Sequence, residues 1–510
     1  MGRKKKELPE IKGVEITGIA AEGKSIAKIK LKETDEHPIV VFIPYGAPGD
    51  IVNIKIDKKK HSFAEGHITE IVKPSPIRIA PKCEYFGVCG GCKWQHIPYE
   101  DQLKFKRQQV VDALTRIGKI DIPEVPMTLG SEKIWGYRNK MEYTFSDKRW
   151  KSWEEMRGER EASEETNALG FHIPGSFDKV LQINKCWLQD EKGNDIRNHI
   201  FERAKYLNDN DSTFKDFQPG ELFYDIKSNK GFFRTVMIRE VTTGEIMVCM
   251  VFGDEGRVKG NGEDKTISFV QEISEKFPEI TTIEYVVNKK QNDSISDQEV
   301  NIYEGPGFIE EKMGDLKFRI SPKSFYQTNS LQAEVLYRTA AEFAGLLNND
   351  NTKEKPLVYD LYTGAGTIAN YIANNARKVI GIEYVEDAIK DARINSKING
   401  ITNTEFYAGD MKDVLTGEFI AQHGKPDIII VDPPRAGMHE DVVNTILAAS
   451  PQKVVYVSCN PATQARDLAL MNHKYKVTKV QPVDMFPHTH HVENVVCLEL
   501  REEINNEKEL

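Results

Sequence analysis

The sequence has little of what marks membrane, secreted or disordered proteins. No apolar run approaches the roughly 20 residues of a membrane-spanning helix, and no apolar segment follows the basic residues 1–6, as a secretory signal would require. Seven cysteines in 510 residues are too few for a disulfide scaffold, whereas a hydrophobic content of 39% suffices for packed cores. We therefore expect a cytoplasmic, multidomain protein that is not associated with a membrane.

An excess of positive charge is also missing, since the net charge is −9. The charges are unevenly distributed, however. Residues 1–110 contain 20 Lys and Arg against 14 Asp and Glu, a balance of +6, and the other 400 residues balance at −15. A basic front on an acidic body fits a local nucleic-acid surface. Charge alone does not distinguish such a surface from a solvated, lysine-rich face.

The first 310 residues are predicted to form two domains. Short β-rich segments at 14–20, 38–44 and 51–57, with basic loops between them, predict a small barrel of the oligonucleotide-binding type over 7–73. Residues 74–310 predict a mixed, strand-rich central domain, which begins with a helix over 99–117. Within it, the charged stretch 147–166 lacks periodicity, and we expect an exposed, mobile loop there.

From about residue 311 to 502 the pattern becomes that of an α/β domain. Helical segments, such as 331–347 and 388–398, alternate with continuous apolar strands at 357–361, 379–383, 405–408, 428–431 and 454–457. Such strands predict a buried parallel sheet of the Rossmann-like, doubly wound kind. The last two β segments, 477–483 and 494–500, predict an antiparallel hairpin that closes the sheet.

Four cysteines have a spacing typical of a metal site. Cys83, Cys89 and Cys92 form a C-x5-C-x2-C pattern, and Cys186 follows alone. Four thiolates suit either zinc or a [4Fe–4S] cluster. Structural zinc usually uses two CxxC pairs, and only one is present, so the spacing favours iron–sulfur. The CxxxCxxC motif of radical enzymes is absent.

The first strand of the α/β domain runs into a glycine loop at 360–367, Asp-Leu-Tyr-Thr-Gly-Ala-Gly-Thr. This loop lacks the GxGxxG fingerprint of pyrophosphate binding. The second strand ends in Glu383, an acid suited to a ribose diol, and the third is followed by Asp410, placed to meet a purine edge. S-adenosylmethionine is a ligand of this kind, because it has a ribose and a base but no phosphate. By itself, Glu383 would fit a plain surface acid equally well.

A cysteine and a carboxylate follow later strands. Cys459 comes shortly after the strand at 454–457, and the segment Asp432-Pro433-Pro434-Arg435 directly follows the strand before it. Methylation of a pyrimidine carbon needs a thiolate that adds at carbon 6, followed by a base that removes the proton from carbon 5. Cys459 is our candidate nucleophile and Glu493 our candidate base. A lone cysteine is more commonly structural, and Glu493 could be a hairpin surface acid.

Together these motifs resemble the RNA uracil-5-methyltransferases, in particular the bacterial 23S rRNA branch with an N-terminal TRAM domain and an iron–sulfur cluster. The similarity runs from about residue 7 to 500. It is carried by the four cysteines with Gln95-His96, by 325–329 (Phe-Tyr-Gln-Thr-Asn), 360–367, 432–437 (Asp-Pro-Pro-Arg-Ala-Gly), 458–461 (Ser-Cys-Asn-Pro) and 491–493 (His-Val-Glu). Thr363 and Thr367 depart from the family pattern, so we expect different polar contacts in the loop.

The resemblance implies a class I methyltransferase domain, a [4Fe–4S] cluster and 23S rRNA as the partner of a monomeric enzyme. It implies that S-adenosylmethionine is held by residues at five positions: Gln327, Tyr362, Glu383, Asp410 and Asp432. Three alternatives stay open. The first is the same chemistry on tRNA, although the tRNA enzymes typically lack the TRAM domain and the cluster. The second is cytosine-5 methylation of RNA, which the Ser458-Cys459 context disfavours. The third is a non-catalytic iron–sulfur protein that binds RNA.

Overall fold

The computed structural model describes residues 8–30, 37–159, 161, 163–259, 264–347 and 354–502. The chain divides into two compact units, one made of residues 1–131 and 432–510, the other of residues 132–431. The basic start at residues 1–6 lies outside the described residues. Within the described part of the chain, no helix is long and apolar enough to cross a membrane.

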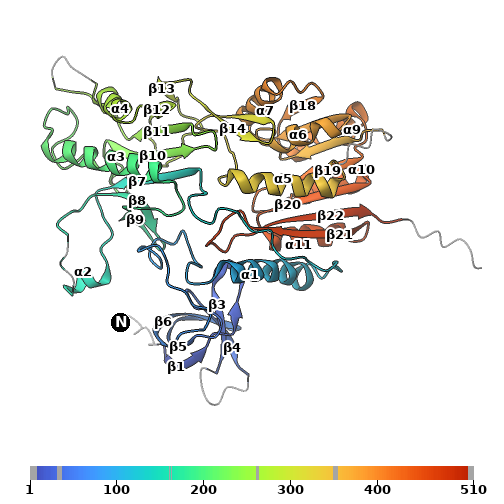
Figure 1. Ribbon diagram of the computed structural model, residues 1–510, viewed down its shortest axis with the longest axis horizontal. Coiled ribbons are helices and arrows are strands. Elements are labelled where there is room, and N and C mark those ends of the chain that lie inside the picture. The colour runs from blue at the N-terminus through green and yellow to red at the C-terminus, as the bar shows by residue number, and fades with distance from the viewer. Residues whose placement is uncertain are drawn as a thin grey trace, which may run out of the picture. The chain divides into compact units, whose positions relative to one another are not determined.

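The first unit begins with a six-stranded sheet in the order β1-β5-β6-β4-β3-β2 (Figure 1). Alternate side chains of β1, β3, β4 and β5 are buried in one apolar cluster, which includes Val14, Ala27, Val41 and Ile54. The strands therefore enclose a small core of their own, as the alternation of apolar residues predicts. The strands are β1 (Glu10–Glu15), β2 (Gly18–Ile19), β3 (Ser25–Ile29), β4 (Ile39–Ile43), β5 (Ile51–Lys59) and β6 (Phe63–Lys73).

The rest of the first unit combines a helix from the N-terminal part with elements from the C-terminal part. The predicted helix over 99–117 is observed as α1 (Tyr99–Asp112), which continues into a π-helical turn, η2 (Ala113–Ile117). It packs against α11 and β21. The predicted closing hairpin is confirmed, since β21 pairs antiparallel with β22, and β22 with β20. These elements are α10 (Glu440–Ala449), β20 (Lys453–Ser458), α11 (Pro461–Met471), β21 (Tyr475–Val483) and β22 (Glu493–Leu500).

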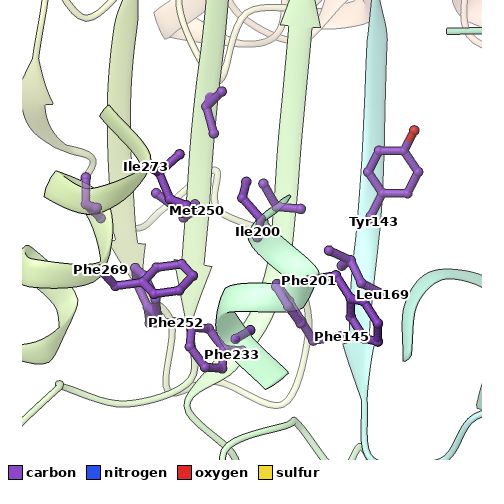
Figure 2. Close-up of a cluster of buried hydrophobic side chains, with 14 of the residues drawn as sticks. Tyr143, Phe145, Leu169, Ile200, Phe201, Phe233, Met250, Phe252, Phe269 and Ile273 are labelled. Atoms are coloured by element: carbon purple, nitrogen blue, oxygen red, sulfur yellow. The ribbon is translucent and has the colours of Figure 1, made fainter. Parts of the chain in front are cut away.

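The second unit contains a seven-stranded mixed sheet in the order β13-β12-β11-β10-β7-β8-β9. Figure 2 shows its core, where Ile200 and Phe201 of α3 and Phe269 and Ile273 of α4 pack on aromatic and aliphatic side chains of the strands, such as Phe252. Alternate residues of β7 and β11 face this core, as their period of two requires. The elements are β7 (Lys140–Ser146), α2 (Trp153–Arg157), β8 (Ala168–Ile173), β9 (Ser176–Gln182), α3 (Glu191–Asn210), β10 (Phe233–Glu240), β11 (Ile246–Phe252), α4 (Lys265–Lys276), β12 (Thr282–Val287) and β13 (Asn301–Glu304).

The charged stretch 147–166 is more ordered than predicted. It contains the helix α2, which is closed by a capping box between Ser152 and Glu155. Arg149 pairs with Glu155 at 2.8 Å, and both side chains are largely buried. The expectation of a loop is therefore wrong for residues 153–157, because a Ser-x-x-Glu capping box stabilises a helix start without apolar periodicity. Residues 160 and 162 lie outside the described part of the chain.

The second unit also contains four parallel strands in the order β18-β17-β16-β19, with helices between them (Figure 1). All four coincide with predicted strands to within one residue, because long apolar runs between helices admit few other structures. The elements are β14 (Ile309–Met313), β15 (Leu316–Ile320), α5 (Ser330–Ala344), β16 (Leu357–Leu361), α6 (Thr367–Ile372), η3 (Ala373–Asn375), β17 (Lys378–Glu383), α7 (Glu386–Ile398), β18 (Thr404–Ala408), α8 (Met411–Val414), α9 (Gly417–His423) and β19 (Ile428–Val431).

Candidate active site

The glycine loop after β16 makes a sharp turn that depends on left-handed backbone. Tyr362, Gly364 and Gly366 have φ values of 65°, 55° and 73°. A side chain at Gly366 would place its Cβ 2.9 Å from the Cβ of Ala392 on α7, closer than carbon atoms approach. Glycine is therefore required at 366 both for its φ and for the close approach of the helix. The strained φ of Tyr362 marks it as a residue whose position the loop dictates.

Two carboxylates fasten this loop. The Oδ2 atom of Asp360 accepts hydrogen bonds from the hydroxyl of Thr363 at 2.5 Å and from the Ala369 N–H at 3.1 Å. Glu383, at the end of β17, accepts from the Gly364 N–H at 3.1 Å and from the Val385 N–H at 3.0 Å. Burial raises the pKa of Asp360 to about 7, so its carboxyl can be neutral near physiological pH. Thr363 thus has a defined loop-fastening contact.

The other predicted cofactor residues of the second unit have structural partners. Asp410 caps the N-terminus of α8 by accepting from the Lys412 N–H, and it pairs with the Lys412 ammonium at 3.5 Å. Gln327 is 9% exposed, and its carbonyl accepts from the side-chain amide of Asn139 at 3.0 Å. The same amide donates to Ser330 Oγ at 2.7 Å. Sequence reasoning missed Asn139, because a lone asparagine carries no motif of its own.

The candidate nucleophile and base lie in the first unit, together with the Asp-Pro-Pro-Arg segment. Cys459 follows β20 and directly precedes Asn460, which caps the N-terminus of α11. Glu493 is the first residue of β22, the strand paired with β20, and is 5% exposed. Burial raises the pKa of the Cys459 thiol, and the charges of Glu493 and Asp432 add to this shift, so the three groups are close enough to interact. The fold thereby assembles residues that are 61 positions apart in the sequence, from 432 to 493.

Arg435 is the cation of this cluster, and the sequence analysis named it only as part of the Asp432-Pro433-Pro434-Arg435 segment. Its side chain hydrogen-bonds Cys459, and its charge lowers the pKa of both Cys459 and Glu493. Its backbone is also fastened, since its carbonyl accepts from Asn460 Nδ2 and from Thr463 Oγ1, each at 3.1 Å. A cation held beside a thiol favours the thiolate.

Burial dominates the protonation of the pair. It raises the pKa of Cys459 to about 11, with Glu493 and Asp432 adding to the shift and Arg435 opposing it. It raises the pKa of Glu493 to about 8, again with Asp432 adding and Arg435 opposing. At neutral pH both groups are therefore largely protonated in the protein alone. A carboxyl with a pKa near the working pH can give and take a proton with little cost, as general catalysis requires.

The four predicted cluster cysteines are divided between the two units. In the first unit, burial and the charges of Cys89 and Cys92 raise the pKa of the Tyr45 hydroxyl, so both thiols lie near that ring. In the second unit, Cys186 accepts backbone hydrogen bonds from Leu188 and Gln189. Within the described residues, no group of three or more His, Cys, Asp or Glu side chains is placed to hold a metal ion.

Two parts of the chain match family models, and the whole chain resembles known proteins. Residues 308–501 match the family model described as tRNA (Uracil-5-)-methyltransferase, and residues 6–69 match the TRAM domain. Proteins named as uncharacterized RNA methyltransferases from Bacteroides thetaiotaomicron and Porphyromonas gingivalis are both 52% identical. Each alignment covers 95% of this chain and, respectively, 100% and 99% of the relative.

A solved structure is similar over nearly the whole chain. It is the Pyrococcus abyssi tRNA (uracil-54, C5)-methyltransferase in complex with S-adenosyl-L-homocysteine, with a TM-score of 0.67 and 28% identity. The match covers 96% of this chain and 100% of that one. The predicted fold class, an α/β protein with an N-terminal TRAM domain and a Rossmann-like methyltransferase domain, is thereby confirmed.

Proposed function

Since this chain belongs to the S-adenosylmethionine-dependent RNA (uracil-5-)-methyltransferase family, we propose that it forms 5-methyluridine in RNA through a covalent bond between Cys459 and the target uracil. The observation that supports this mechanism is the mutual electrostatic influence of the buried Glu493, the half-buried Cys459 and the exposed Arg435. A structural cysteine would need neither a hydrogen-bonded cation nor a buried carboxyl beside it.

In the proposed reaction, Cys459 gives its proton to solvent water and its sulfur adds to carbon 6 of the uracil, which turns the ring into an enolate. Carbon 5 of the enolate attacks the methyl group of S-adenosylmethionine, and S-adenosylhomocysteine leaves. Glu493, ionised for this step, then takes the proton from carbon 5. The electron pair of that C–H bond restores the carbon 5–carbon 6 double bond and expels the Cys459 thiolate. Arg435 stabilises the thiolate at both ends of the cycle.

S-adenosylmethionine supplies the methyl group, and the chain's own residues orient it. We propose that Glu383 binds the ribose diol, since its carboxylate already closes the loop against Gly364. Gln327, Tyr362 and Asp432 are proposed as further contacts. Asp410 would meet the purine edge with the carboxylate oxygens that its capping bond and ion pair leave accessible, because its side chain is 43% exposed.

The proposed target is 23S rRNA, bound by a monomeric enzyme in the cytoplasm, with the TRAM domain gripping the RNA backbone. A specific observation favours tRNA as a second candidate. The solved enzyme from Pyrococcus abyssi is named for a tRNA position, and its match covers 96% of this chain, the N-terminal domain included. The presence of a TRAM domain therefore does not separate the two substrates.

We further propose that Cys83, Cys89, Cys92 and Cys186 hold a [4Fe–4S] cluster. The surroundings of Cys186 support this proposal. Two backbone N–H groups point at its sulfur, as is common for cluster thiolates. Burial raises the pKa of the Cys186 thiol, and the charge of the buried Arg197 guanidinium opposes that shift. Among the described residues, the Nε and Nη1 atoms of Arg197 have no hydrogen-bond partner. An anionic cluster would neutralise that charge. Such a cluster would supply structural cross-linking of the two chain segments.

The decisive experiment measures methyl transfer from labelled S-adenosylmethionine to 23S rRNA and to tRNA that both lack uracil-5 methylation. We expect label as 5-methyluridine, lost in Cys459→Ala and retained in the control Cys249→Ala, a cysteine buried in β11. Label in tRNA alone would establish the second candidate. Undiminished transfer by Cys459→Ala, or no transfer to either RNA by enzyme with a full complement of iron, would refute the proposed mechanism.

The cluster has its own test, which does not depend on activity. Protein purified without oxygen should contain iron and acid-labile sulfide in equal amounts, and Cys186→Ala should contain neither, whereas Cys249→Ala should match the unaltered protein. Zinc in place of iron would support the other interpretation of the four cysteines.

A further inference from the structure

Helix α1 buries a polar stripe where a surface helix normally buries an apolar one. Tyr99, Gln102 and Lys106 recur at the spacing that places residues on one face. The side chains of Gln102 and Lys106 are 0% exposed. Burying a lysine and a glutamine requires dedicated partners, because an unpaired polar group in the interior is costly. The hydrogen-bond partners of these side chains indicate the role of the stripe.

All three side chains bond to one loop, residues 484–492, which leads directly into Glu493. Lys106 Nζ donates to Asp484 Oδ1 at 2.5 Å and to the Phe486 carbonyl at 3.0 Å. The hydroxyl of Tyr99 donates to Asp484 Oδ2 at 2.8 Å. The start of the loop is thus held at both carboxylate oxygens and at one carbonyl.

Gln102 holds the middle of the same loop. Its Oε1 accepts from the His488 N–H at 2.9 Å, and its Nε2 lies 3.2 Å from His488 Nδ1. His488 has a φ of 66°, a conformation that needs such support in a residue other than glycine. The His488 carbonyl accepts from the N–H groups of Lys93 and Trp94, at 2.9 and 3.0 Å, just after Cys92. The segment of the predicted cluster therefore supports the loop from its other side.

We propose that the polar stripe of α1 is a positioning device for the catalytic base, and that Lys106, Gln102 and Tyr99 are positioning residues for the proton-removal step. This inference rests on the proposed function, because it assigns Glu493 as the base. Each of the three side chains bonds to the loop before Glu493. The remaining bonds of Tyr99 and Gln102 go to the backbone of Ser131, Trp94 and Ile97. Disturbing them should therefore impair the step that needs Glu493 and spare the step that needs Cys459.

The two steps can be separated because the covalent Cys459–uracil bond persists until the base acts. The experiment mixes each enzyme with S-adenosylmethionine and unmodified transcripts of 23S rRNA and tRNA. It follows both the protein–RNA adduct that survives denaturation and the release of 5-methyluridine. Glu493→Gln serves as the reference, and Lys104→Met as the matched control, since Lys104 lies on the exposed side of the same helix.

We expect Lys106→Met/Asp484→Asn, which removes both buried charges together, to form the adduct at the unaltered rate and to release product at least tenfold more slowly. Tyr99→Phe, which removes one hydroxyl and keeps the ring, should lengthen the adduct lifetime severalfold. Lys104→Met should behave like the unaltered enzyme. Because Tyr99→Phe changes so little packing, it keeps the test meaningful even if the double variant folds poorly.

Two results would overturn the inference: an unaltered adduct lifetime in Tyr99→Phe and the double variant, or a parallel loss of adduct formation and release, which would indicate a purely structural role. Failure of the proposed function looks different. In that case Glu493→Gln itself accumulates no adduct, or Cys459→Ala remains active.

Discussion

The glycine loop of the second unit and the cysteine–glutamate cluster of the first both follow β-strands, but they are built by opposite means. The loop is defined by its backbone, with three left-handed residues and N–H groups bonded to Glu383 and Asp360. The cluster is defined by the charges of side chains, with Glu493 and Cys459 shifting in pKa because they are buried near Asp432. A ligand is bound by a shaped backbone, whereas proton transfer needs groups whose pKa values are displaced.

The largest effect is expected at the base. Glu493→Gln keeps the shape of the side chain but cannot take the carbon 5 proton, so turnover should fall roughly 10³-fold while the covalent adduct accumulates. Gel electrophoresis of denatured protein with labelled RNA measures the adduct. Glu499→Gln, on the same strand and half-exposed, is the control. Normal turnover in Glu493→Gln would show that proton transfer does not depend on this carboxyl, and the contrast between the cluster and the glycine loop would then fail.

Arg435 should have the next largest effect. Its guanidinium lowers the pKa of Cys459, so Arg435→Gln should raise that pKa and slow adduct formation by about 100-fold at neutral pH. The sign of the pH dependence is set by the thiol. More alkaline buffer ionises it, so both enzymes should form the adduct faster as the pH rises, and the deficit should shrink only as the pH approaches the pKa of about 11. A thiol pKa that is unchanged in Arg435→Gln, measured by thiolate absorbance, would mean that Arg435 acts on the RNA and not on the thiol.

A smaller effect is expected at the glycine loop, the site that is defined by its backbone. Glu383→Gln weakens a charge-assisted bond to the loop and the proposed bonds to the ribose, so binding of S-adenosylhomocysteine should weaken by roughly tenfold to 100-fold. Calorimetric titration of the protein measures this affinity directly. Glu386→Gln, at the exposed start of α7, is the matched control. An equal loss of affinity in Glu383→Gln and Glu386→Gln would indicate a general effect of removing a negative charge.

The smallest effect concerns stability. The pKa of Glu493 is raised in the folded protein to about 8, so folding favours its neutral form. Its contribution is therefore fully present below the unfolded pKa, near 4.5, and is lost as the pH rises through about 8. Glu493→Gln should gain thermal stability relative to the unaltered enzyme by several degrees between pH 5 and pH 9. An unchanged difference in melting temperature across this range would contradict the burial of the carboxyl.

Periodicity and motifs predicted most of the fold. The strands of the α/β domain and the helix over 99–117 were predicted closely, because apolar runs and their period reflect burial directly. Strands β3 and β6 were not predicted. Both interleave polar residues with apolar ones, and β6 also contains Gly66; β3 pairs with β4, and β6 pairs with β5. The helix α2 escaped prediction because its stability comes from a cap and an ion pair.

The sequence by itself determined the class of chemistry, because the order of a glycine loop, Asp432-Pro433-Pro434-Arg435, Cys459 and Glu493 satisfies few other reactions. Tertiary structure decided how these groups behave. Only the fold buries Glu493 beside Asp432, brings the Arg435 guanidinium to the thiol, and turns the polar stripe of α1 towards the loop that precedes Glu493, the proposed base. The physical reason is that protonation and orientation depend on dielectric surroundings and on distances, which neighbouring residues in the sequence do not set.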